Sequence, residues 1–227
     1  MVVGNGLIAN TLSEFENNKD VLIFASGVSN SSDFSSKNFE REEKLLLQNA
    51  NTNKMLFYFS TCSVYDVSLE QTPYVKHKKR MEELVEKNFL TYCIMRLPTL
   101  VGKTNNSFTF FNNFKSKLKK GDKITVFKNA TRYLFDVDAL PSIISLFMSQ
   151  NNKNVINVAF DNKVSVVDIV DYMKFSMQTD SIVEYVDRGF DISIDNKEFI
   201  GILTANNFDF AQIGQDYKNI IDKYIHC

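Results

Sequence analysis

The segment VVGNGLIA (Val2–Ala9) decides how the fold begins, because a short apolar run leads directly into two glycines and then into a helical stretch. The spacing Gly4-x-Gly6-x-x-Ala9 predicts a tight turn between a strand and a helix. Glycines permit such a turn, and the amide groups that open the helix favour an anion such as a phosphate. An ordinary strand–helix turn has the same pattern, so the neighbouring segments must decide between the two interpretations.

Three further apolar runs predict buried strands: VLIFA at Val21–Ala25, MLFYFST at Met55–Thr61 and YCIMRL at Tyr92–Leu97. Helical patterns at Phe39–Asn49 and Tyr74–Asn88 separate them. Strands that alternate with helices predict an α/β fold with a mostly parallel sheet that is covered on both faces.

The pattern changes after Gly102, where a Phe-rich helix is predicted at Ser107–Leu118. The other elements predicted in this part are a strand at Gly121–Phe127, a helix at Asp138–Met148, a strand at Val155–Val158 and a helix at Ser165–Phe175. We therefore predict two parts, residues 1–104 and residues 105–227, with the second interleaved with the last strands of the sheet.

The composition excludes several classes of protein. The chain has 227 residues and a formal net charge of −1, which argues against the basic surface of nucleic-acid-binding proteins. Three widely spaced cysteines give no zinc pattern and no disulfide framework, so we expect no metal site and a reducing, cytoplasmic location. No apolar run approaches the ~18 residues of a transmembrane helix, and no signal-peptide pattern is present, so no membrane association is expected.

Two groups of polar residues are candidates for chemistry. Thr61, Cys62 and Ser63 follow a predicted strand, and the carboxyl ends of parallel strands are where such sheets bind ligands. Capping of the strand end is the simpler interpretation. Tyr74 and Lys78 lie one helical turn apart, and an ammonium near a phenol favours the phenolate, so the pair suits acid–base chemistry. The same spacing also arises by chance on a solvated helix.

The order of the motifs is more specific than any one of them. Along the chain come GNGLIA, VLIFASG, FSTCSVY, YVKHK, RLPTLVG, Arg132 before FDVDAL, and INVAFDNKVSVVDIV. This order resembles that of the extended short-chain dehydrogenase/reductase superfamily, the NAD-dependent epimerase/dehydratase group that acts on nucleotide-activated sugars. The resemblance extends from Val2 to Val170 and weakly beyond.

The resemblance implies a Rossmann-type doubly wound sheet, with a cofactor-binding domain over residues 1–104 and a small mixed substrate-binding lobe over residues 105–227. It implies that Thr61 binds the reacting sugar oxygen, that Tyr74 is the catalytic acid/base, and that Lys78 holds the nicotinamide ribose. Cofactor contacts are implied for Gly4, Asn5, Gly6, Leu7, Ile8, Ala9, Ala25, Ser26, Gly27, Lys78, Pro98 and Thr99. Substrate contacts are implied for Cys62, Ser63, Asn105 and Arg132. Arg132 matches the arginine that clamps the diphosphate of the sugar nucleotide.

Substitutions inside the motifs narrow the implied reaction. The 4,6-dehydratases of the superfamily carry an Asp-Glu pair directly after the catalytic threonine, whereas this chain has Cys62 and Ser63. Neither side chain suits the acid–base work of eliminating water near neutral pH. We therefore expect a reductase or an epimerase of a nucleotide-activated 4-keto sugar, in bacterial surface-polysaccharide biosynthesis, rather than a dehydratase.

The chain is shorter than the superfamily pattern on the adenosine side. Only Asn10–Asp20 separates Ala9 from Val21, where the superfamily has two more strands and an acidic residue. The sequence therefore does not distinguish NAD from NADP. A second hypothesis stays open, that the chain is a cofactor-deficient member that binds a sugar nucleotide or a partner protein. A third, an interaction protein unrelated to the superfamily, requires that the doubly wound sheet be absent.

The resemblance also suggests a homodimer. Members of the superfamily often dimerise through two helices, which here would be Phe39–Asn49 and Tyr74–Asn88. Met81, Leu84 and Val85 either supply the apolar seam of such a dimer or pack on the chain's own sheet.

Overall fold

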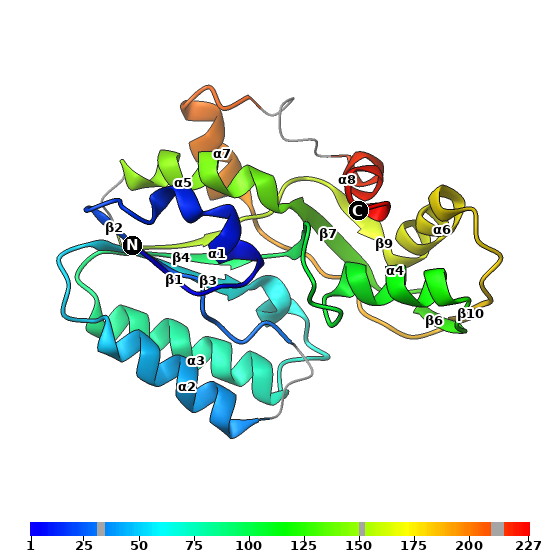
Figure 1. Cartoon of the computed structure of the whole chain (residues 1–227), viewed down its shortest axis with the longest axis horizontal. Helices are drawn as coiled ribbons and strands as arrows, with labels where there is room; N and C mark the ends of the chain where they lie inside the picture. Colours follow the sequence, from blue (N-terminus) through cyan, green and yellow to red (C-terminus); the bar gives the residue numbers. More distant parts are fainter. Residues whose placement is uncertain (31–34, 150–152, 210–215) are drawn as a thin grey trace.

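The fold centres on a parallel sheet with helices on both faces (Figure 1). The structure is a computed structural model that describes residues 1–30, 35–149, 153–209 and 216–227. Within these ranges the main sheet has five strands in the order β1-β2-β3-β4-β8, all parallel. Their bounds are β1 Val2–Val3, β2 Val21–Phe24, β3 Met55–Thr61, β4 Tyr92–Leu97 and β8 Lys153–Asn157. The predicted α/β fold with a mostly parallel sheet is confirmed.

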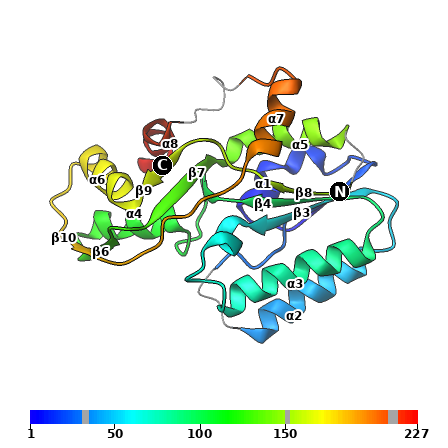
Figure 2. The same cartoon turned by 180° about the vertical axis from the view of Figure 1, so that it is seen from behind.

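Both faces of the central strands are covered, which explains their unbroken apolar sequences. Every residue of β2 and β3 is buried. Two helices cover one face of the sheet, α2 (Ser36–Gln48) and α3 (Pro73–Asn88). The other face is covered by α1 (Leu7–Thr11), α5 (Leu140–Met148) and α7 (Lys197–Ala205), as Figure 2 shows from behind.

Helix α3 begins where the sequence supplies a cap. The Thr72 hydroxyl accepts a hydrogen bond from the Val75 amide, and Pro73 occupies the first turn, where its nitrogen needs no partner. Further along, Met81 and Val85 are fully buried against the sheet. For Met81 and Val85 the alternative of packing on the sheet is correct, because the chain's own strands already cover both side chains. The dimer itself stays a prediction.

Helix α1 is shorter than the predicted helical stretch. It ends at Thr11, and a 3-10 turn at Ser13–Phe15 (η1) follows. Leu12 and Phe15 are buried on the sheet, so the chain folds back onto the core instead of continuing the helix.

A second group of elements forms a smaller lobe beside the main sheet (Figure 1). One small sheet contains β5 (Thr99–Val101), β7 (Thr131–Asp136) and β9 (Lys163–Ser165), and another pairs β6 (Ile124–Phe127) with β10 (Val183–Val186). The helices of the lobe are α4 (Phe110–Lys120), α6 (Val166–Met177) and α8 (Tyr217–Ile225). These elements enclose an apolar core of their own, which includes Phe111, Ile169 and Ile221.

The predicted helices of this part agree with α4, α5 and α6 apart from their first or last few residues. The sequence predicts neither β5 nor β9, because each is only a few residues long and carries no apolar run. Strand β8 returns from the lobe to the main sheet, while the boundary at residue 104 stays a prediction. Among the helices that the structure describes, none is long and apolar enough to cross a bilayer.

Candidate active site

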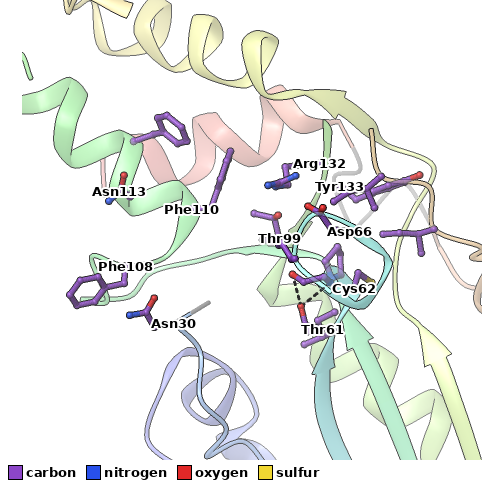
Figure 3. A pocket seen from close by; sticks show the side chains of 17 residues that line it. Asn30, Thr61, Cys62, Asp66, Thr99, Phe108, Phe110, Asn113, Arg132 and Tyr133 are labelled. Atoms are coloured by element: carbon purple, nitrogen blue, oxygen red, sulfur yellow. Dashed lines mark hydrogen bonds between the residues drawn. The ribbon is translucent and has the colours of Figure 1, made fainter. Parts of the chain in front are cut away.

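A cavity of about 470 Å³ lies between the main sheet and the lobe. The residues predicted for the site that line it are Thr61, Cys62, Ser63, Pro98, Thr99 and Arg132. Phe108, Phe110 and Phe114 from the lobe add apolar surface, and Figure 3 shows Phe108 and Phe110 across the opening from Thr61. The cavity thus joins residues from β3, β5 and β7, at the edge where open α/β sheets bind their ligands.

Thr61 reaches the cavity because it is the last residue of β3, in which successive side chains point to opposite faces. Its neighbour Ser60 points to the other face, where its hydroxyl donates to Glu82 on α3 at 2.5 Å. The Thr61 hydroxyl donates to Ser63 Oγ at 3.0 Å and accepts from the Ser63 amide at 3.1 Å. This hydroxyl therefore caps the strand end and lines the cavity at the same time.

The residue after Thr61 is not suited to acid–base work. The Cys62 thiol donates to the Arg96 carbonyl oxygen at 3.2 Å. Burial raises the pKa of Cys62 to about 12, with the Arg96 cation opposing this shift and the Glu82 carboxylate adding to it. A thiol with this pKa stays protonated near neutral pH, so it serves neither as a base nor as a nucleophile.

Arg132 places a cation on the cavity wall. Its Nη1 donates to the Thr131 carbonyl at 2.7 Å, and its guanidinium lies over the Phe110 ring, 5.8 Å from the centroid. Burial lowers the pKa of Arg132, and the nearby carboxylate of Asp66 raises it. Because a guanidinium stays charged in proteins, its N–H groups suit an anionic ligand.

Asp66, which no sequence motif indicated, also lines the cavity beside Arg132 (Figure 3). Asp66 is 3% exposed, and its Oδ1 accepts a hydrogen bond from the Ser68 amide at 3.0 Å. It follows the 3-10 turn Cys62–Tyr65 (η2) that extends β3 into the cavity. Its position just after the strand-end motif was the signal that would have identified it.

The predicted acid/base pair lies beside the cavity. Among the described residues, neither Tyr74, Lys78 nor the exposed Asn105 belongs to the cavity lining. Tyr74 is buried in a small apolar cluster with Val28, and Leu69, which does line the cavity, packs against this cluster. The predicted site residues therefore fall into two groups. Residues such as Thr61 and Arg132 line the cavity, whereas Tyr74 and Lys78 are buried behind the cavity wall.

Lys78 binds a buried carboxylate that the sequence analysis did not identify. Glu42 on α2 is fully buried, and its Oε1 accepts hydrogen bonds from Lys78 Nζ at 3.0 Å and from the Tyr58 hydroxyl at 2.8 Å. Its Oε2 accepts from the Val28 amide at 2.6 Å and lies 3.0 Å from His77 Nε2. One carboxylate therefore joins α2, β3, α3 and the segment that follows β2.

These donors keep Glu42 ionised. Burial by itself would raise the pKa of Glu42, but the Lys78 ammonium, the His77 and Val28 hydrogen bonds and the Tyr58 hydroxyl lower it to about 2. An ionised carboxylate only accepts hydrogen bonds, so His77 Nε2 carries the hydrogen that faces Glu42. Burial and the Glu42 carboxylate together raise the pKa of Tyr58, which keeps this phenol neutral.

The Glu42 carboxyl predicts acid-sensitive stability. Its pKa is about 2 in the folded protein against 4.5 for the ordinary group, so the unfolded chain takes up the proton first as the pH falls. The contribution is complete above about pH 5 and is lost toward pH 2, with a slope of about 1.4 kcal/mol per pH unit. Urea unfolding between pH 7 and pH 3 measures this slope. We expect Glu42→Gln to lose this component, and an unchanged slope would contradict the assignment.

The glycine-rich turn keeps the predicted geometry. Gly4 has φ +138°, and a Cβ there would lie 2.4 Å from the Ala25 carbonyl oxygen, so only glycine lets the turn pass against the end of β2. Gly6 has open space on its Cβ side, and no side chain caps α1. The open face and the uncapped amides suit a phosphate, so these residues fit the pyrophosphate of a dinucleotide. On the adenosine side, β1 is the outermost strand of the main sheet over the described ranges.

Gly27 is close to the Lys78–Glu42 pair. A Cβ on Gly27 would lie 2.7 Å from Lys78 Nζ and 3.1 Å from Glu42 Oε1, so the chain passes directly over the ion pair. Its neighbour Ser26 accepts hydrogen bonds from Arg41 through both its hydroxyl and its carbonyl. In the part of the chain that the structure describes, no group of three His, Cys, Asp or Glu side chains is placed to hold a metal ion.

No protein-family model and no curated protein sequence matches the chain. Among solved structures, the dTDP-glucose 4,6-dehydratase of Bacillus anthracis in complex with NAD has a TM-score of 0.70 at 15% identity, and the match covers 99% of this chain and 78% of that one. The dTDP-4-dehydrorhamnose reductase of Clostridium acetobutylicum has a TM-score of 0.69 at 17% identity, with coverages of 96% and 85%. The UDP-Glc/GlcNAc 4-epimerase of Campylobacter jejuni has a TM-score of 0.68 at 18% identity, with coverages of 97% and 80%.

These enzymes belong to the extended short-chain dehydrogenase/reductase superfamily, and the chain has the fold of that superfamily. The matches cover 96–99% of this chain and 78–85% of the other three, so this chain spans about four-fifths of their length. A dehydratase, a reductase and an epimerase all share it at this level of similarity. The shared fold therefore does not distinguish among these three reactions.

Proposed function

We propose that the chain is an NAD(P)-dependent reductase or epimerase of a nucleotide-activated 4-keto sugar, acting in bacterial surface-polysaccharide biosynthesis. The observation that carries this proposal is the cavity, where the Thr61 hydroxyl and the Arg132 guanidinium line one space beside the predicted pair Tyr74 and Lys78. Its size lies within the range of about 300–1,000 Å³ for small-molecule sites.

The proposed roles follow from the side-chain chemistry. The Thr61 hydroxyl binds the reacting sugar oxygen, and Tyr74 gives that oxygen its phenolic proton. The Lys78 ammonium stabilises the phenolate that remains, and Arg132 binds the diphosphate. When bound, the reduced nicotinamide supplies the hydride. Leu69 packs against the cluster that holds Tyr74 and also lines the cavity, so Tyr74 lies next to the cavity wall.

Dehydration is not part of the proposal. The position directly after Thr61 holds a thiol whose pKa burial raises to about 12, followed by the Ser63 hydroxyl. Elimination of water needs a group that accepts a proton near neutral pH. The matching dehydratase shares the fold alone, so activity measurements must decide whether Asp66 replaces the missing carboxylates.

A cofactor-deficient binding protein is the alternative function. The main sheet ends at β1 in the described ranges, and Lys78 is engaged by Glu42 and Tyr58. Both observations favour weakened cofactor binding. The alternative keeps the sugar nucleotide in the cavity but gives Tyr74 no catalytic role.

Titration with NADH and with NADPH, followed by nicotinamide fluorescence, tests the proposal. Saturable binding of either supports the enzyme and identifies the cofactor. If a folded sample binds neither dinucleotide, the proposal that the chain is an enzyme is wrong, and the cofactor-deficient binding protein remains.

The sugar-nucleotide site has its own expected result. Removing the guanidinium fork in Arg132→Lys costs a charge-assisted interaction, so we expect UDP- or dTDP-sugar binding to weaken by about 10- to 100-fold in calorimetry. The exposed Arg188 provides the matched control, and Arg188→Lys should leave the affinity unchanged. Equal affinities for the wild type and Arg132→Lys would exclude the diphosphate role.

Two further expectations belong to this proposal. A cytoplasmic location follows from the activated-sugar substrate and from the cysteine content. A homodimer through α2 and α3 remains a proposal, although Met81 and Val85 do not contribute to it. Light scattering that finds a monomer at high concentration would exclude the dimer.

A further inference from the structure

A fully buried carboxylate lies behind the wall of the candidate site, and no role in the proposed reaction requires it. Burying a carboxylate is strongly unfavourable unless its oxygens are well partnered. Glu42 meets this cost with donors from three directions: Lys78 and His77 on α3, Tyr58 on β3, and the Val28 amide. An apolar side chain would fill this position on α2 more simply, as Leu46 does one turn later.

The two oxygens of Glu42 have different partners. Oε1 binds Lys78 Nζ at 3.0 Å and the Tyr58 hydroxyl at 2.8 Å, while Oε2 binds the Val28 amide at 2.6 Å. The backbone between β2 and Val28 passes over the same ion pair at Gly27, where a Cβ would lie 2.7 Å from Lys78 Nζ. The carboxylate therefore spans from the lysine to the turn that covers it.

We propose that Glu42 is a positioning residue that ties Lys78 to the Gly27–Val28 turn, so that the lysine and the turn hold one common arrangement. The coupling itself does not depend on the proposed function. Its consequence for the cofactor does, because Lys78 and Gly27 are both proposed to contact the nicotinamide side. His77 completes the arrangement: its ring stacks on Phe39 with centroids 4.3 Å apart and directs Nε2 at the carboxylate.

Glutamine cannot replace Glu42 without losing some of the hydrogen bonds that the carboxylate accepts. The carboxylate accepts from four donors, whereas an amide has one accepting oxygen and must turn its NH₂ group toward two of them. Glu43 is the matched control, since it is the next residue of α2 and pairs with Arg80 at 2.9 Å, while it lies no closer than 3.9 Å to His77 Nδ1.

The first measurement is amide hydrogen exchange at Val28 in the protein without ligands. Four proteins are compared: wild type, Glu42→Gln, Lys78→Met and the double variant, each normalised to the amides of β4 to remove global unfolding. We expect Lys78→Met to accelerate Val28 exchange about tenfold when Glu42 is present, equivalent to about one hydrogen bond, and to leave it unchanged in the Glu42→Gln background. Glu43→Gln should behave as wild type. Equal effects of Lys78→Met in both backgrounds would overturn the proposal.

The second measurement is NADH or NADPH affinity in the same four proteins. We expect Glu42→Gln to weaken binding about tenfold when Lys78 is present and to have no effect in Lys78→Met. An equal loss in both backgrounds would show that Glu42 does not act through Lys78. If the wild type binds neither dinucleotide, the proposed function fails, and Val28 exchange alone decides the coupling.

Discussion

Turnover should fall by about 10²- to 10⁴-fold when Tyr74 is replaced by Phe, because the phenolic hydroxyl is the proposed proton donor to the sugar oxygen. The ring itself is retained, so the cluster with Val28 and Val75 should keep its packing. Sugar-nucleotide affinity should change little, since Arg132 and the cavity lining are untouched. The measurement is steady-state turnover together with calorimetric binding of the same substrate.

The control for Tyr74→Phe is a second buried tyrosine far from the cavity. Tyr92 lies at the opposite end of β4 and is 7% exposed, so Tyr92→Phe makes the same chemical change outside the site. It should retain turnover within a factor of about two, because Tyr92 does not line the cavity and its hydroxyl takes no part in the proposed proton transfer. Near-normal turnover in Tyr74→Phe would remove the catalytic role and favour the cofactor-free alternative.

Lys78→Met should reduce the free energy of unfolding by about 3–5 kcal/mol at pH 7, because it leaves the Glu42 carboxylate buried without its countercharge. The side chains of Lys78 and Glu42 are 3% and 0% exposed, so solvent does not screen the loss. Urea unfolding followed by circular dichroism measures the effect. At pH 3 the difference should shrink, because protonation of Glu42 in the variant removes the unpaired charge.

The adjacent residue supplies the comparison for this stability effect. The side chain of Lys79 is 45% exposed and lies 3.7 Å from Glu70, so the pair contributes little. Lys79→Met should therefore change stability by no more than about 0.5 kcal/mol. Similar losses of unfolding free energy in Lys78→Met and Lys79→Met would show that the buried ion pair stabilises the fold no more than the exposed one.

The sequence predicted the central strands well because their apolar runs report burial on both faces directly. Met55–Thr61 is both the predicted and the observed strand, and Tyr92–Leu97 likewise. The sequence did not predict β5 and β9, because these strands are stabilised by pairing with β7 and not by their own composition. Propensity within a window of a few residues does not carry that information.

The candidate site was predictable only where order along the chain carries the signal. Thr61 and Arg132, which the motif order indicated, both line the cavity, and their roles stay predictions. The sequence did not predict a role for Glu42, because its neighbours along the chain are charged and the segment has the composition of a solvent-exposed helix face. Its spacing of four from Leu46 puts both on the buried side of α2, but only the fold reveals that Lys78 approaches from another helix.

The path of the chain through its two cores has a consequence for how the protein folds. Strand β4 pairs with β8, and the whole of β5, α4, β6, β7 and α5 lies between them along the chain. Helices α5 and α7 also return to cover the main sheet. A fragment that ends at residue 104 would therefore expose one face and one edge of its sheet to water. The pairing closes a long loop, whose entropy must be lost before the contact forms, so the two cores should fold late and as one cooperative unit.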